Sequence, residues 1–145
     1  MTRLVDKAAV RDYLARNGVA NDVLVANVLS GFDLAQPLYE QRLEPDTELF
    51  QFMRRPAVGR PDLRVGNWFC LRGATRGGLA IMDGLAGREV HHFRVGSELV
   101  ALEGTASRMT RDWQIEIGGV GGHTQIYVPP RLIGHILSVG NAHPW

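Results

Sequence analysis

The chain has 145 residues, which is the length of one domain and enough to bury about two-thirds of its unfolded surface. Its hydrophobic (45%) and charged (21%) contents are typical of a soluble globular protein, and no run approaches the roughly 20 apolar residues of a membrane span, so we expect no membrane partner. Cys70 is the only cysteine, which excludes an internal disulfide and a cysteine-based zinc site.

Arginine supplies most of the positive charge. The formal net charge is +1, and Lys7 is the only lysine among the 16 basic residues. Residues 54–76 contain six arginines against one acid, Asp62, whereas in residues 33–48 the acids outnumber the single arginine. A basic segment of this kind indicates an anionic ligand, a nucleic acid or an acidic partner. A solvated basic surface accounts for it equally well.

The N-terminal part of the chain has helical periodicity. Residues 6–17 place their apolar side chains on one stripe, and Asn17-Gly18 ends this predicted helix. Asn21-Asp22 can cap a second helix that carries Val23 to Leu29. Residues 34–43 fit a third helix with Pro37 in its first turn.

After Pro45 the hydrophobic period changes to two, which is typical of strands. Clusters of Gly, Pro and Asp separate the short runs predicted as strands, which are residues 48–53, 67–71, 79–81, 90–95, 99–102, 113–117 and 125–128. Residues 131–139 fit either a short helix or a strand. We therefore predict a single α+β domain in which a helical segment (residues 1–43) packs on a compact, mostly antiparallel β core (residues 44–145).

Several common chemistries are not expected. His91 and His92 are adjacent on a predicted strand and point to opposite faces, so they cannot bind one metal ion together without distortion. The sequence has no GxSxG elbow and no Walker loop. We therefore predict no metal site.

Residues 118–130 read GGVGGHTQIYVPP, a glycine-rich run that leads into a short strand ended by two prolines. Ordering glycine costs more backbone entropy than ordering any other residue. One interpretation is a mobile hairpin loop. The other is a loop whose backbone approaches a ligand closely, in the manner of an anion-binding nest.

Three segments together resemble the ADP-ribosyltransferase toxin superfamily. They are ELFQFMRR (48–55), with Gln51 and Arg54, ALEGTAS (101–107), and Gln125-Ile-Tyr-Val-Pro, where glutamine stands in place of the catalytic glutamate. GNWF (66–69), Asp112-Trp113 and GGHTQIYVP are similar to the C-terminal toxin domains of bacterial polymorphic toxins of type 46. The glycine run before Thr-Gln-aromatic also resembles necrotizing NAD glycohydrolase toxins. The chain departs from the superfamily in lacking a clean Ser-Thr-Ser and a Glu-x-Glu, and Gln51 stands where an arginine is expected.

The resemblance implies an ADP-ribosyltransferase-like fold and NAD as the substrate, with no metal. Cleavage of the nicotinamide–ribose bond passes through an oxocarbenium-like ribose, so the site must hold the pyrophosphate, the ribose and the nicotinamide ring. Gln125 would orient the ribose 2′-hydroxyl, and Asp112 and Glu116 are the candidates to activate an acceptor. The residues expected to bind NAD are Arg54 or Arg72 at the pyrophosphate, Trp68 or Phe69 against the nicotinamide ring, and Gln51, Thr105, Ser107, Gly121, Gly122 and Thr124 around them.

The expected activity is transfer of ADP-ribose to a macromolecule, either protein or structured RNA, and NAD hydrolysis is the alternative. A metal-independent ribonuclease that uses His123 or His92 and a non-catalytic binding module stay open as further alternatives. The toxin reading also implies that the domain is carried at the end of a larger secreted effector and delivered to the cytoplasm of a target cell. Its producer would then need an immunity protein, which we expect to be acidic and to cover either residues 54–76 or the NAD site.

Overall fold

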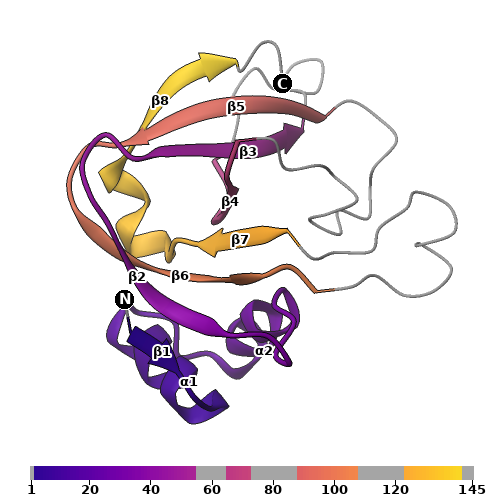
Figure 1. Cartoon of the computed structure of the whole chain (residues 1–145). Coiled ribbons are helices and arrows are strands. Elements are labelled where there is room, and N and C mark those ends of the chain that lie inside the picture. The colour runs from indigo at the N-terminus through magenta and orange to yellow at the C-terminus, as the bar shows by residue number, and fades with distance from the viewer. Residues whose placement is uncertain (1, 55–64, 73–87, 108–122, 142–145) are drawn as a thin grey trace, which may run out of the picture.

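The computed structural model of the chain describes residues 2–54, 65–72, 88–107 and 123–141. These residues form two α-helices, one 3₁₀ helix and strands of a single sheet (Figure 1). In chain order the elements are β1 (Thr2–Leu4), α1 (Lys7–Arg16), α2 (Asp22–Ser30), β2 (Leu38–Leu43), β3 (Glu48–Arg54), β4 (Trp68–Cys70), β5 (Arg88–Val95), β6 (Leu99–Thr105), β7 (Thr124–Tyr127), the 3₁₀ helix η1 (Pro130–His135) and β8 (Ile136–Asn141).

The strands of the described residues form one eight-stranded sheet in the order β1-β2-β6-β7-β4-β3-β5-β8. Each neighbouring pair is antiparallel. In Figure 1, β3, β5 and β8 lie on one side and β2, β6 and β7 on the other, with the short β4 running between them. The predicted α+β fold with an antiparallel β core is confirmed.

The two sides of the curved sheet enclose a hydrophobic core. Alternate strand residues face the same way, so we call the face that carries Phe69 and Ile126 the inner face. Its core cluster consists of Leu43, Leu49, Phe69, Phe93, Val95, Leu99, Ala101, Ile126, Val128 and Ile136, with Leu132 and Ile133 of η1 packed against it. Phe69 meets Phe93 edge to face at 5.5 Å between ring centroids.

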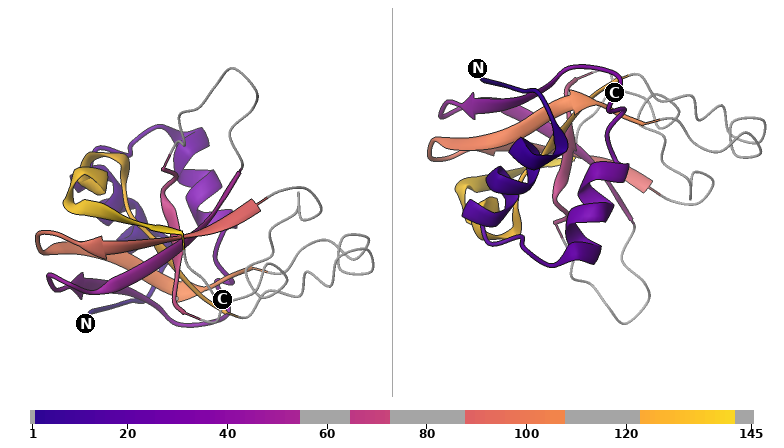
Figure 2. Two further views of the ribbon diagram at one scale, coloured as in Figure 1. Left: turned by 90° about the horizontal axis from the view of Figure 1, so that it is seen from above. Right: turned by 90° about the horizontal axis from the view of Figure 1, so that it is seen from below.

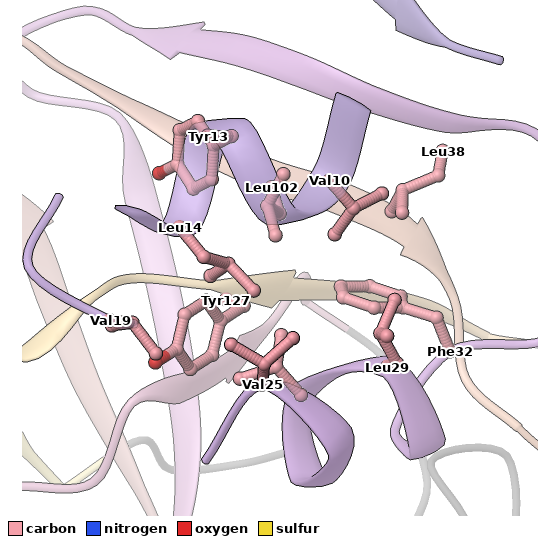
Figure 3. Packing of buried hydrophobic residues seen from close by; sticks show 11 residues of the cluster. Val10, Tyr13, Leu14, Val19, Val25, Leu29, Phe32, Leu38, Leu102 and Tyr127 are labelled. Carbon is pink, nitrogen blue, oxygen red and sulfur yellow. The ribbon is translucent and has the colours of Figure 1, made fainter. Parts of the chain in front are cut away.

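The opposite face, which we call the outer face, carries two hydrophobic clusters. In the first, both helices pack on β2, β6 and β7 through the apolar side chains that Figure 3 shows, and the view from below in Figure 2 shows both helices in front of the sheet. This helix-packed cluster contains Val10, Tyr13, Leu14, Val19, Val25, Val28, Leu29, Phe32, Leu38, Leu102 and Tyr127. The second, the Phe50 cluster, consists of Phe50 and Cys70 with Phe52 and Val90 against them.

Both predicted helices begin at polar N-caps, and the cap of the second helix at Asn21 is the one that the sequence predicts. Asp6 caps α1 by accepting a hydrogen bond from the backbone N–H of Ala9 at 2.8 Å. Asn21 caps α2 by accepting from Val23 at 2.9 Å. Gly18 follows α1 with a φ of +84°, a left-handed conformation that glycine adopts without steric cost.

The predicted third helix is wrong. Residues 34–43 contain β2, which pairs with β6 from Tyr39↔Glu103 to Leu43↔Leu99 and buries Leu38 and Leu43. Pairing on both edges of the strand, with β1 and with β6, overrides the helical propensity of this segment. The segment predicted as a helical cap thus contributes two strands to the sheet, and β1 was not predicted.

Most of the other predicted strands match observed ones. Residues 131–139 contain both of the predicted alternatives, because η1 is followed directly by β8. The strands predicted over 79–81 and 113–117 lie outside the described residues.

Candidate functional site

Gln125 lies in a row of residues that are paired directly across the outer face of the sheet. Gly104 on β6 pairs with Gln125 on β7, and Gln125 pairs with Cys70 on β4. The row continues through the pairs Cys70–Phe50 and Phe50–His92. Directly paired residues in antiparallel strands share a face. We call the sequence Gly104–Gln125–Cys70–Phe50–His92 the cross-sheet row.

The amide oxygen of Gln125 is buried and accepts no hydrogen bond from the described residues. Its position is at the border of the two outer-face clusters, because Tyr127 belongs to the helix-packed cluster and Cys70 to the Phe50 cluster. A buried carbonyl oxygen without a donor costs about 1–3 kcal/mol, so such an atom in a folded protein requires an explanation. A donor from a ligand, such as a ribose hydroxyl, is one explanation.

Cys70, beside Gln125, is an inert neighbour. It is 1% exposed, and its thiol contacts the backbone carbonyl of Phe50 at 3.4 Å. Burial raises the pKa of the Cys70 thiol to about 12. At neutral pH the residue is therefore a protonated core side chain that packs as a small hydrophobic group.

Trp68 lies on the same face as Gln125 but belongs to the core. Its ring meets Phe32 at 5.1 Å and Tyr127 at 5.0 Å, and it is half-buried. Gly31 brings its backbone against the ring, because a Cβ there would lie 2.5 Å from the Cη2 atom. Only the exposed part of the ring is open to a ligand.

Phe69 lies on the inner face and is 1% exposed. Its ring is packed in the inner core, which leaves no open face for stacking on nicotinamide. Of the two residues predicted to stack on the nicotinamide ring, only Trp68 therefore remains a candidate.

Gln51 on β3 is buried, and both ends of its amide are bonded to backbone. Its Nε2 donates to the carbonyl of Trp68 at 2.9 Å, and its Oε1 accepts from the N–H of Gly66 at 2.9 Å. Gly66 and Trp68, where β4 begins, are thus tied to β3. Gln51, a predicted NAD-binding residue, therefore holds the backbone at the start of β4 in place.

The predicted hydroxyl residues gather where β6 ends and β7 begins. Thr105 pairs with Thr124, one residue further along the ladder than the Gly104–Gln125 pair. Their side chains therefore lie on the inner face, opposite to Gln125. Ser107 follows β6, and its N–H donates to the carbonyl of Gly31 at 3.1 Å. This hydrogen bond holds the end of α2 at the end of β6.

Arg72 lies above Phe50, the fourth residue of the cross-sheet row. Its guanidinium carbon is 4.8 Å from the centre of the Phe50 ring, in a cation–π contact. Its Nη2 lies 3.2 Å from Oε1 of Glu48. The Nε2 atom of His92 lies 3.3 Å from that same oxygen, and the His92 ring stacks on Phe50 at 4.9 Å.

Glu103 is a candidate that the sequence analysis missed. It lies on β6 opposite Ile126 and so on the inner face, and burial raises the pKa of its carboxyl. A carboxyl group with a raised pKa is a general signal of a functional position. The residue lies inside the ALEGTAS segment, where the resemblance points only to the hydroxyl residues.

The remaining predicted site residues are not placed. Asp112, Glu116, Gly121 and Gly122 lie outside the described residues, as does the glycine-rich run itself. For Arg54, the backbone at the end of β3 is described and pairs with Arg88.

Two further observations concern the described part of the chain. Neither of its helices is long and apolar enough to cross a membrane. It also contains no group of three or more His, Cys, Asp or Glu side chains that could hold a metal ion.

No protein-family model matches the chain, and no curated protein matches its sequence. Solved structures do match its fold. Tse6, in complex with Tsi6, has a TM-score of 0.69 and 15% sequence identity, over 88% of this chain and 89% of the Tse6 chain. Rhs1-CT, in complex with its cognate immunity protein RhsI1, has a TM-score of 0.52 and 16% identity, over 75% of this chain and 80% of that one. The predicted similarity to polymorphic toxin domains thus holds at the level of the fold.

Proposed function

We propose that this chain is an NAD-consuming bacterial toxin domain that cleaves the nicotinamide–ribose bond and transfers ADP-ribose to a protein or structured RNA. The observation that carries the proposal is the buried amide oxygen of Gln125, which lacks a donor among the described residues. It stands in the Gln-Ile-Tyr-Val-Pro segment through which the sequence resembles the superfamily. The similarity in fold to Rhs1-CT, which is bound by an immunity protein, agrees with a toxin.

The reaction does not require a strong acid or base at the position of Gln125. Nicotinamide leaves from an already cationic nitrogen, so no strong general acid is needed. The positive charge then develops on the ribose, and a hydroxyl group held by Gln125 keeps the ring oriented as the bond breaks. A glutamine amide performs this orienting task without carrying a charge.

Hydrolysis of NAD is the second candidate activity, and the identity of Gln125 favours it. A transferase commonly uses a carboxylate to activate its acceptor, whereas the direct neighbours of Gln125 in the sheet are Gly104 and Cys70. Asp112 and Glu116, the carboxylates expected to activate an acceptor, lie outside the described residues. With water as the acceptor, the site needs only to bind and orient NAD.

An assay with labelled NAD distinguishes these activities. Purified protein is incubated with NAD labelled in the adenine, with and without a cell extract. Loss of NAD supports the proposal, and label on macromolecules then indicates transfer, whereas free ADP-ribose indicates hydrolysis. RNA degradation without NAD loss would support the ribonuclease instead, and no activity of either kind would support a binding module.

The toxin proposal includes a partner and a place of action. We propose that the domain is delivered to the cytoplasm of a target cell as part of a larger effector and that an acidic immunity protein protects the producer. The six arginines of residues 54–76 provide the matching charge. A complex that leaves both residues 54–76 and Gln125 exposed would contradict this.

A further inference from the structure

Glu48 brings together two side chains that bind anions. The single oxygen Oε1 of Glu48 lies 3.2 Å from Nη2 of Arg72 and 3.3 Å from Nε2 of His92. Arg72 is a permanent cation, and His92 is one when protonated. Two such groups that converge on one carboxylate oxygen form a site whose geometry fits an oxygen anion in general, including a phosphate oxygen.

The carboxylate of Glu48 is weakly held in this position. Its side chain is 51% exposed and that of Arg72 58% exposed, and ion pairs so exposed contribute little to stability. The Nε2 atom of His92 is buried and has no hydrogen bond among the described residues, although Glu48 lies at ion-pair distance. His92 thus has hydrogen-bonding capacity that Glu48 does not use, and Glu48 can move away into solvent.

The position of the cluster relative to Gln125 is also informative. His92 and Gln125 are two members of the cross-sheet row, and both carry a buried polar atom without a hydrogen bond among the described residues. Three strand spacings separate them, which corresponds to roughly 14 Å along a sheet. Arg72 stands over Phe50, between the two. An extended ligand on the outer face therefore has the length to span from Gln125 to His92.

We propose that Arg72 and His92 form the subsite for the pyrophosphate of a nucleoside diphosphate, and that Glu48 occupies this subsite as an internal competitor until the ligand displaces it. This inference rests on the proposed function, because NAD would place its nicotinamide ribose at Gln125 and its pyrophosphate at Arg72. Phe50 fixes both anion-binding groups, since His92 stacks on its ring and Arg72 covers it.

The proposal predicts opposite effects for members of one ion-pair cluster. Glu48→Gln removes a negative charge that repels and competes with the phosphate, and should strengthen ADP binding about fivefold or more. Arg72→Ala and His92→Gln should each weaken it, about tenfold for Arg72. A purely structural ion pair would give the same direction for Glu48 and Arg72, because both changes would break the same contact.

Glu98→Gln is the matched control. Glu98 pairs with Arg42 at 3.4 Å in an exposed ion pair between the β2 and β6 ends, and its loss changes the net charge by the same amount. Binding of magnesium-free ADP to the purified wild-type chain and these variants is measured by calorimetry. A thermal melt of each variant confirms that it is folded.

Stronger binding by Glu48→Gln together with weaker binding by Arg72→Ala and His92→Gln supports the subsite. Equal affinities for Glu48→Gln and Glu98→Gln, or weaker binding by Glu48→Gln, overturns it, as does an absence of ADP binding in every variant up to millimolar concentration. NAD consumption by the wild-type chain is measured in parallel. NAD loss without the Glu48 effect means that the subsite alone is wrong. The Glu48 effect without NAD loss means that the proposed NAD chemistry is wrong and that the subsite serves another nucleoside diphosphate.

Discussion

Gln125 and Cys70 lie directly opposite each other on β7 and β4, where the helix-packed cluster of the outer face meets the Phe50 cluster. The two side chains have opposite requirements. The buried thiol of Cys70 has a hydrogen-bond acceptor in a backbone carbonyl. The buried amide oxygen of Gln125 has no donor among the described residues. A buried oxygen without a donor does not stabilise the fold, and the proposed function accounts for the one at Gln125 as the acceptor of a ribose hydroxyl.

Gln125→Ala should abolish NAD consumption and toxicity while leaving the protein folded. The alanine removes the amide that would hold the ribose, and it also removes the buried oxygen that lacks a donor, so the free energy of unfolding should change by less than about 1 kcal/mol. NAD loss by the purified variant and its urea unfolding curve measure the two effects separately.

Gln41 offers a matched control for Gln125. It is also a strand glutamine whose buried amide oxygen has no hydrogen bond among the described residues, but it lies on β2, opposite Ala101 and on the inner face. Gln41→Ala should therefore leave NAD consumption unchanged. Retained toxicity of Gln125→Ala at normal expression, or an equal loss of activity in both variants, would remove Gln125 from the site.

Gln51→Ala should act on stability first. The substitution removes the hydrogen bonds to Gly66 and Trp68, at a cost of about 1–3 kcal/mol in the free energy of unfolding. Urea denaturation of the variant measures this loss. A variant that is as stable as the wild type but binds NAD more weakly would instead restore Gln51 to the NAD-binding residues that the sequence predicts.

The sequence predicted the elements whose signals are local. Asn21 caps the second helix and Gly18 follows the first, as predicted, because caps and left-handed glycines act within one turn of the chain. The segment Leu38–Leu43 was misassigned because its helical propensity is local, whereas its pairing with β6 joins residues that are far apart in the chain. Such long-range pairing cannot be predicted from the sequence of the segment alone.

Only part of the site could be predicted from the sequence, again because the rest depends on long-range strand pairing. The row that joins Gln125 to Cys70, Phe50 and His92 depends on the order of four strands, and strand order cannot be read from alternation alone. Arg72 was expected at a pyrophosphate from its charge, but Glu48 and His92 beside it could be found only from the structure. Gln51 was placed at the NAD site by the resemblance, and only its hydrogen bonds show its structural task.

Glu103→Gln should change stability in a way that depends on pH. Burial raises the pKa of Glu103 in the folded protein, so folding disfavours its ionised form. Its contribution to stability is fully present below the unfolded-state pKa of about 4.3 and is lost as the pH rises through the higher folded-state pKa. Glu103→Gln cannot ionise at this position, so the variant does not lose stability in this way as the pH rises.

Thermal melts at pH 4 and pH 7.5 measure the effect. The melting temperature of Glu103→Gln relative to the wild type should be higher at pH 7.5 than at pH 4. Glu98→Gln, at a more exposed position, controls for the change in net charge. A difference between Glu103→Gln and the wild type that is the same at both pH values would mean that the Glu103 carboxyl is not destabilised by burial.

Gly31→Ala tests the packing that holds Trp68 beside the cross-sheet row. A Cβ at Gly31 would lie 2.5 Å from Cη2 of Trp68, so the ring or the end of α2 must move. The backbone there has a φ of −75°, which alanine adopts freely, so the cost comes from overpacking and should be about 1–3 kcal/mol. Gly134→Ala makes the same chemical change where nothing lies within 4 Å and should leave stability unchanged.

A double-mutant cycle identifies the contact as the cause. If the clash with Trp68 destabilises Gly31→Ala, then combining it with Trp68→Leu should cost less than the sum of the two single changes, since the smaller side chain leaves room for the new methyl group. Additive effects in urea denaturation would show that Trp68 does not limit this position. Because Trp68 lies on the same face as Gln125, Gly31→Ala should also lower NAD consumption per folded molecule, whereas Gly134→Ala should not. Normal NAD consumption by a destabilised Gly31→Ala variant would confine Trp68 to the core and remove it from the proposed nicotinamide site.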